Sequence, residues 1–156
     1  MSDNIYAIAD HLAARGVPET GIKAMMANIG VETGYTYDYL TEQKGDRSDP
    51  ARGLFQFDPR GKGLTKPYGE YLRETEQGDS MEAQLDFMVD SITGKYKAGR
   101  DHIGAGNAAK VKKAFDEGDI VAATKLFSEK ILRPGKPHLD RRVAEAKKLE
   151  KLLGER

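Results

Sequence analysis

Apolar residues recur at intervals of three and four along most of the chain, which predicts a body built from short amphipathic helices. In the first such helix, over residues 2–15, Ile5, Ile8 and Leu12 lie on one face and Gly16 follows the end. The same spacing, read together with capping residues, predicts helices over residues 18–34, 67–76, 79–93, 108–117, 120–131 and from 139 onward. The glycines between residues 94 and 106 predict a loop.

The helix expected over residues 18–34 carries an acid on its apolar side. Ile22, Met25 and Ile29 form one stripe, and Glu32 continues it three residues after Ile29. Apolar surroundings and the negative end of the helix dipole both favour the protonated carboxyl group. The pattern therefore predicts an acid whose pKa is raised toward neutral pH. The alternative is a glutamate that reaches from the helix end to water.

The helical periodicity disappears between residues 35 and 58. Tyr35, Tyr37 and Tyr39 alternate with polar residues, a turn-rich stretch covers residues 44–50, and a second alternating run covers residues 53–58. This pattern predicts a small irregular β-hairpin. We therefore expect a mainly α protein of the α+β type, folded as a single domain over residues 1–156.

Composition narrows the class of protein. Charged residues make up 32% of the chain and no apolar run approaches 18 residues, so stable membrane insertion is not expected. The N-terminal segment has acids where a secretory signal needs basic residues, so we expect no signal peptide. The chain has no cysteine, and its three histidines (His11, His102 and His138) show no metal-ligand spacing. We accordingly expect no metal and no cofactor.

Charge is distributed unevenly although the net charge is zero. Residues 1–94 carry a balance of −7 and residues 95–156 a balance of +7. The basic half could face an anionic polymer, and a solvated helical surface explains the same counts. The zero net charge argues against nucleic acid as a partner.

Three segments resemble one known family. Residues 27–35, ANIGVETGY, resemble the motif around the catalytic acid of phage tail lysozymes and related lytic transglycosylases, usually N-I-x-x-E-S-G-F. Residues 53–57, GLFQF, resemble their G-L-F-Q-W segment, and residues 127–135, FSEKILRPG, followed by Arg141 and Arg142, resemble their closing segment. The three matches keep the family's order. Thr33, Phe57 and Leu132 replace the usual serine, tryptophan and glutamate, so no role is carried to Leu132.

The resemblance implies a lysozyme-like fold whose hairpin flanks the active-site cleft, and a monomeric enzyme that acts on bacterial peptidoglycan. Glu32 would be the general acid that protonates the glycosidic oxygen between N-acetylmuramic acid and N-acetylglucosamine. The substrate contacts implied or suggested for the groove are Gln56, Tyr35, Tyr37, Phe57 and Arg60. A hydrogen bond at the hairpin end is the alternative for Gln56, and core packing is the alternative for Phe57.

The chemistry after protonation depends on a second group. Two-carboxylate glycosidases place a partner about 5–5.5 Å away for retention or roughly 6.5–9.5 Å away for inversion. Asp46 and Asp49 are the best candidates by position and Asp58 is the third, while turn formation is the alternative for each. Without such a partner, Glu32 could act as acid and then base while the substrate's own 6-hydroxyl closes a 1,6-anhydro ring, as in lytic transglycosylases.

Three functions compete. The first is a peptidoglycan muramidase, either a phage endolysin made in the host cytoplasm and released to the wall, or a virion-associated lysozyme. The second is a lysozyme-like fold that only binds glycan or serves as a structural part of the virion. The third, a nucleic-acid binder using the basic half, predicts steeply salt-dependent binding to DNA.

Overall fold

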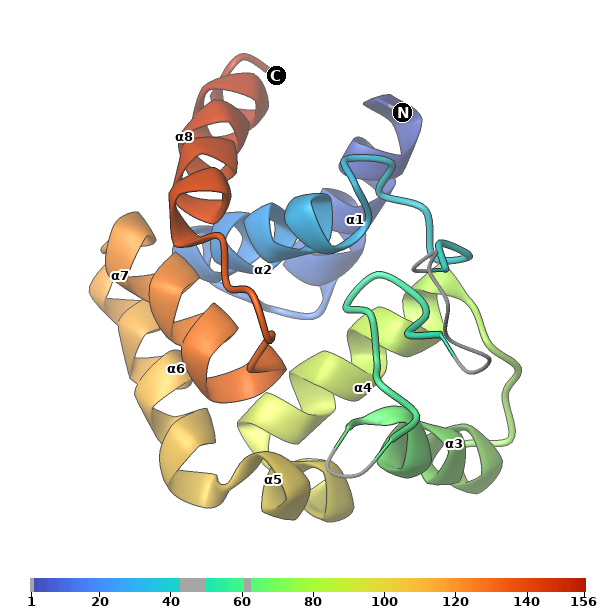
Figure 1. The fold of residues 1–156 in the computed structure, drawn as a ribbon. Coiled ribbons are helices and arrows are strands. Elements are labelled where there is room, and N and C mark those ends of the chain that lie inside the picture. The colour runs from blue at the N-terminus through green and yellow to red at the C-terminus, as the bar shows by residue number, and fades with distance from the viewer. Residues whose placement is uncertain (1, 43–49, 61–62) are drawn as a thin grey trace.

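A computed structural model describes residues 2–42, 50–60 and 63–156 (Figure 1). This part of the chain is mainly helical, as predicted, and it contains eight α-helices and one π-helical segment. The elements are α1 (Ser2–Ala14), α2 (Glu19–Glu32), α3 (Thr65–Glu74), α4 (Met81–Thr93), α5 (Lys97–Ile103), α6 (Ala105–Glu117), α7 (Ile120–Leu126), η1 (Phe127–Leu132) and α8 (Leu139–Gly154). None of the described helices is long and apolar enough to cross a membrane.

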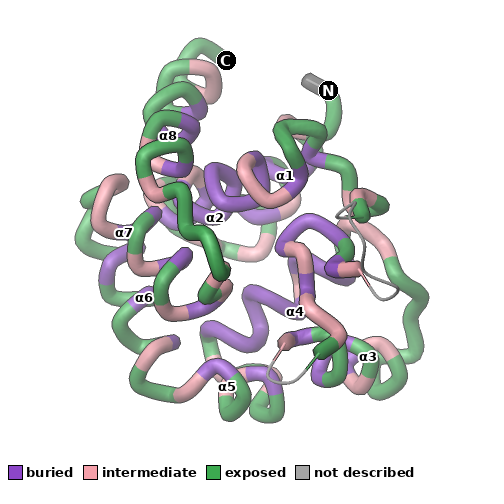
Figure 2. Tube along the Cα trace, viewed as in Figure 1, coloured by how far each residue is buried: buried purple, intermediate pink, exposed green. Residues whose placement is uncertain are grey.

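The central element is α2, which packs against α1, α6, α7 and α8 (Figure 1). All of its residues from Ala24 to Gly30 are buried, and Met26, Ala27 and Ile29 are fully enclosed. Figure 2 shows the same pattern, with α2 and α4 forming the buried interior and the outer helices turning exposed faces outward. Burial on nearly every side holds the C-terminal end of α2 in one position, and that end carries Glu32.

The structure does not support the predicted β-hairpin, whose turn over residues 44–50 lies mostly outside the described residues. The described residues form no β-strand, and only two isolated bridges occur, between Glu42 and Arg52 and between Arg52 and Phe57. The physical reason lies in the backbone, because Tyr35 and Tyr37 have φ angles of 67° and 56°, in the left-handed region. An extended strand needs negative φ throughout, so the alternating tyrosines form a chain of turns instead.

Instead of hairpin pairing, side chains of α4 fix the described parts of the segment between α2 and α3. The side-chain amide of Gln84, 3% exposed, accepts a hydrogen bond from the Leu54 N–H at 2.8 Å and donates to the Tyr39 carbonyl at 3.1 Å. Gly53 permits this approach, because a Cβ there would lie 2.7 Å from the Gln84 oxygen. Phe57 then packs against the rings of Tyr68 and Phe87, at centroid distances of 5.2 and 5.5 Å.

The loop predicted between residues 94 and 106 contains α5 instead. Gly94 and Gly104, with φ angles of 88° and 102°, lie on either side of this helix. Gly99 lies inside it because a Cβ there would meet the Ser91 hydroxyl at 1.9 Å. Gly99 is needed for close packing of two helices, but in the sequence it favoured the prediction of a loop. The helix predicted over residues 120–131 is continuous, but its last turn is the π-helix η1.

Candidate active site

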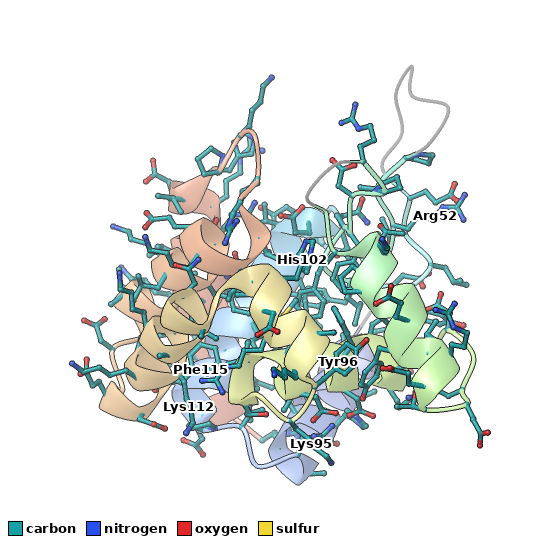
Figure 3. All side chains as sticks on the ribbon, turned by 90° about the horizontal axis from the view of Figure 1, so that it is seen from below. Arg52, Lys95, Tyr96, His102, Lys112 and Phe115 are labelled. Carbon is teal, nitrogen blue, oxygen red and sulfur yellow. The ribbon has the colours of Figure 1, made fainter. Side chains whose placement is uncertain are left out.

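An open cleft of about 800 Å³ lies beside the C-terminal end of α2. One wall comes from the segment between α2 and α3, and the other from α5, η1 and the start of α8. Residues 133–138, which join η1 to α8, form part of that second wall and are called the connector here. Figure 3 views the molecule from below, and His102 of α5 lies there between the orange C-terminal elements and the green elements that include α3.

Glu32 lines this cleft from the last residue of α2. Its side chain is 15% exposed, so the carboxyl group is partly enclosed and still reaches the open space. The sequence left open a glutamate that reaches freely into water. The partly enclosed carboxyl group differs from that alternative. The following residue, Thr33, ends the helix, and its hydroxyl donates back to the Ile29 carbonyl at 2.8 Å.

Arg142 of α8 contacts Glu32 directly. One guanidinium N–H donates to Glu32 Oε2 at 3.0 Å, and the arginine side chain is only 2% exposed. A second N–H donates to Asn28 Oδ1 at 3.0 Å, and Nε donates to the Pro137 carbonyl at 2.5 Å. The amide of Asn28 is itself fixed, because its nitrogen donates to the Ala24 carbonyl at 2.8 Å. This network of hydrogen bonds orients the Glu32 carboxyl group.

Burial and Arg142 act on the pKa of Glu32 in opposite directions. Burial is the larger effect and raises the pKa, because removing water penalises the carboxylate. The charge and hydrogen bond of Arg142 lower it, and the net pKa lies above the ordinary value of a glutamate. The protonated acid therefore persists to higher pH than in an exposed glutamate.

The opposite wall brings together three of the predicted substrate-contacting residues, Gln56, Phe57 and Arg60. Phe57 is 6% exposed and belongs mainly to the aromatic core. The amide nitrogen of Gln56 donates to the carbonyls of Thr41 and Gly53 at 2.9 and 2.7 Å. Its Oε1 is buried and has no hydrogen-bond partner among the described residues.

The two tyrosines lie elsewhere. Tyr37 is 2% exposed, does not line the cleft and donates its hydroxyl hydrogen bond to Glu145. Its placement in the core gives no support to the sugar contact suggested for it in the sequence. Burial and the neighbouring Glu145 carboxylate raise the pKa of the Tyr37 hydroxyl far above its usual range. Tyr35 is 40% exposed and is also absent from the cleft lining.

The candidates for a second carboxylate are described unequally. Asp46 and Asp49 lie outside the described residues. Asp58 lines the cleft, and its carboxylate accepts from the Arg60 backbone N–H at 2.9 Å and from Arg60 Nε at 3.3 Å. Leu132, where the family commonly has a glutamate, lines the cleft as an apolar residue. In the described part of the chain, no group of three or more acidic or histidine side chains could hold a metal ion.

Sequence reasoning missed the contact between Arg142 and Glu32. A signal for it exists in α8, where Arg142 stands three residues after Leu139 and four before Ala146 on the buried stripe. A buried arginine needs an acidic partner. The apolar stripes of α2 and α8 each carry a charged residue, Glu32 and Arg142, and together they could have indicated this pair. The π-helical turn of η1, which places Leu132 in the cleft, had no such signal.

A helical body with a partly buried carboxylic acid in the wall of an open cleft is the arrangement of a lysozyme-like glycosidase. Comparison with known families agrees, since the model of the phage tail lysozyme family matches residues 3–153. The chain belongs to the phage tail lysozyme family, which confirms the resemblance seen in its motifs. No curated protein and no solved structure matches the chain. Membership of this family indicates a lysozyme-like enzyme that degrades peptidoglycan, associated with phage or acting on the cell wall.

Proposed function

We propose that the protein cleaves the β-1,4 bond between N-acetylmuramic acid and N-acetylglucosamine in peptidoglycan, with Glu32 as the general acid. The observation that carries the proposal is the Glu32 carboxyl group, enclosed at a fixed helix end, facing the cleft and raised in pKa. Membership of the phage tail lysozyme family supports the same substrate. The protein acts as an endolysin or as a virion-associated lysozyme.

In the proposed reaction, Glu32 gives its proton to the glycosidic oxygen as the bond from that oxygen to C1 of the muramic acid breaks. The N-acetylglucosamine leaves with a free 4-hydroxyl, and positive charge develops on the sugar ring that remains. Burial of Glu32 favours the protonated form before this step. Arg142 acts after it, because the new carboxylate lies 3.0 Å from a guanidinium N–H.

The second group of the reaction is a further part of the proposal. A carboxylate from Asp46 or Asp49 would act as nucleophile or as base on the far side of the sugar, and Asp58 is the third candidate. The alternative is the transglycosylase outcome, in which Glu32 returns as the base and the 6-hydroxyl closes a 1,6-anhydro ring. The charge of Arg142 is compatible with this alternative as well as with hydrolysis, because it stabilises the Glu32 carboxylate that must act as base.

Substrate contacts from the opposite wall complete the proposed site. Phe57 and Gln56 present an apolar edge and an amide to the cleft, and the Arg60 side chain, 63% exposed, extends from the same wall. We keep Tyr35 as a peripheral sugar contact only, because it lies outside the cleft lining. Metal and cofactor play no part in the proposed reaction.

Loss of turbidity of purified cell walls tests the role of Glu32. Wild type is expected to clear the suspension, and Glu32→Gln is expected to reduce clearing by a factor of about 100 or more, since it removes the transferred proton and keeps the shape. Glu42→Gln, an exposed acid outside the cleft lining, is the matched control and is expected to clear normally. Circular dichroism checks that each variant is folded. Equal clearing by wild type and Glu32→Gln would remove Glu32 from the mechanism.

Mass spectrometry of the released fragments separates the two reaction types. Reducing muramic acid ends indicate hydrolysis, and 1,6-anhydro ends indicate transglycosylation. The third possibility, a glycan-binding or structural part of the virion without catalysis, predicts that wild type binds the walls and releases neither product.

A further inference from the structure

The described residues of the cleft carry more positive than negative charge. Five arginine and lysine side chains line it against two carboxyl groups, Glu32 and Asp58. Two of the five are already paired, because Arg142 contacts Glu32 and Arg60 contacts Asp58. The three that remain are Arg133, Lys136 and Arg141. All three come from the connector and the first turn of α8, so the excess charge lies on one wall.

The connector is held in place at both ends. At its start, Arg133 donates to the Ile103 carbonyl of α5 at 2.7 Å and to the Lys130 carbonyl at 3.2 Å. At its end, the Pro137 carbonyl accepts from Arg142. These acceptors are neutral, so the charge of Arg133 is oriented but not cancelled. Prolines at positions 134 and 137 further restrict the backbone around Lys136.

Lys136 and Arg141 have exposed side chains, and the described part of the structure gives neither one an ion pair or a side-chain hydrogen bond. Two cations that line a cleft without a partner of their own are suited to bind an anionic group of the substrate. The sugar rings of peptidoglycan are neutral. Its anionic groups are carboxylates on the arm at C3 of muramic acid, either the lactyl carboxylate itself or those of the stem peptide that replaces it.

We propose that Lys136 and Arg141 bind the carboxylates carried by the muramic acid arm, so that the cleft selects peptidoglycan over neutral glycans such as chitin. This inference rests on the proposed function, because it places muramic acid next to Glu32. A muramic acid whose glycosidic bond lies at Glu32 carries its arm beside the ring, within the same cleft. The connector wall then receives the arm while the wall with Gln56 receives the sugars.

Binding to insoluble walls, measured by co-sedimentation, tests the inference without requiring catalysis. The reference protein is Glu32→Gln, and the substrate is sacculi without phosphate polymers, either native or with their carboxyl groups amidated by carbodiimide and ammonia. We expect the combined change Lys136→Gln and Arg141→Gln to weaken binding to native sacculi about tenfold, the effect of losing two partly exposed ion pairs. On amidated sacculi the same change is expected to have no effect.

The matched control removes two charges elsewhere. Lys95 and Lys112 are exposed and do not line the cleft (Figure 3), so changing both to Gln is expected to leave wall binding unchanged. Glycan strands stripped of peptide by an amidase distinguish the two sources. An effect of Lys136→Gln and Arg141→Gln that persists on these strands assigns the lactyl carboxylate, and one that disappears assigns the stem peptide.

Three results would overturn the inference. They are equal binding of native and amidated sacculi, an equal loss in the variant with changes at Lys95 and Lys112, and tight binding of double-stranded DNA through Lys136 and Arg141. Failure of the proposed function looks different. A protein that binds carboxylates through the connector wall and never clears cell walls refutes the glycosidase, whereas one that clears them without this preference refutes only the carboxylate site.

Discussion

Replacing Arg142 with methionine is expected to destabilise the protein, and to do so more strongly as the pH rises. The substitution keeps the unbranched aliphatic bulk and removes the donors to Glu32, Asn28 and the Pro137 carbonyl. Loss of one partner of a buried ion pair costs about 3–5 kcal/mol when the remaining charge is trapped. Glu32 can take up a proton instead, which limits the cost, so we expect about 3 kcal/mol near neutral pH. For a chain of this length that lowers Tm by about 6–12 °C.

The pH dependence follows from the pKa of Glu32. Burial raises this pKa in the folded protein, so the protonated acid contributes stability below its unfolded pKa, and this is lost as the pH rises through the folded pKa. Arg142 lowers the pKa, so the Arg142→Met protein keeps its proton to higher pH and pays more to release it. The difference in unfolding free energy between wild type and variant must therefore grow from acid to neutral pH.

Urea denaturation at several pH values measures this difference. Arg141→Met, the exposed neighbour on α8, serves as the stability control and is expected to change the free energy of unfolding by less than about 0.5 kcal/mol. Catalysis gives an independent measure, because the alkaline limb of the pH–activity profile should move to higher pH in Arg142→Met. A folded variant whose stability gap shrinks with rising pH, or whose alkaline limb moves to lower pH, would refute the pairing of Arg142 with Glu32.

Two further substitutions test how α2 and α8 are joined behind the site. Gly30→Ala places a Cβ 2.5 Å from the Tyr37 hydroxyl, so urea denaturation should show a decrease of about 1–3 kcal/mol in the free energy of unfolding. In the control Gly106→Ala the new Cβ meets no atom within 4 Å, and the free energy of unfolding should increase by about 0.5 kcal/mol. Tyr37→Phe leaves the Glu145 carboxylate, 6% exposed, without its donor and should cost about 2 kcal/mol, while the exposed Tyr35→Phe should cost almost nothing. Equal stabilities within either pair would contradict the packing described here.

The acid on α2 could be predicted because it obeys the same spacing as the core around it. Glu32 continues the stripe of Met25 and Ile29, and this spacing predicts an acid on the core-facing side at the end of the helix. The helices confirmed by the structure share this property, since local spacing and caps determine their existence. Ser80, for example, caps α4 by accepting from the Ala83 N–H at 3.0 Å.

What the sequence could not predict depends on contacts between distant segments. The supposed hairpin looked like a strand pattern, but Tyr37 is pulled into the core by Glu145, 108 residues away, with its backbone in the left-handed region. Gly99 looked like a loop residue because the sequence does not show the Ser91 hydroxyl beside it. The role of the connector likewise appears only when η1 and α8 bring its charges to one wall.

The last residue of the chain returns to the first helix. The guanidinium of Arg156 lies 4.8 Å from the centre of the Tyr6 ring and forms an ion pair with Asp10, so the end of α8 lies beside α1 (Figure 1). Such a unit can be inserted into a surface loop of another protein through two short joints. Fusions that carry this lytic unit as an internal cassette are therefore as feasible as fusions at either terminus.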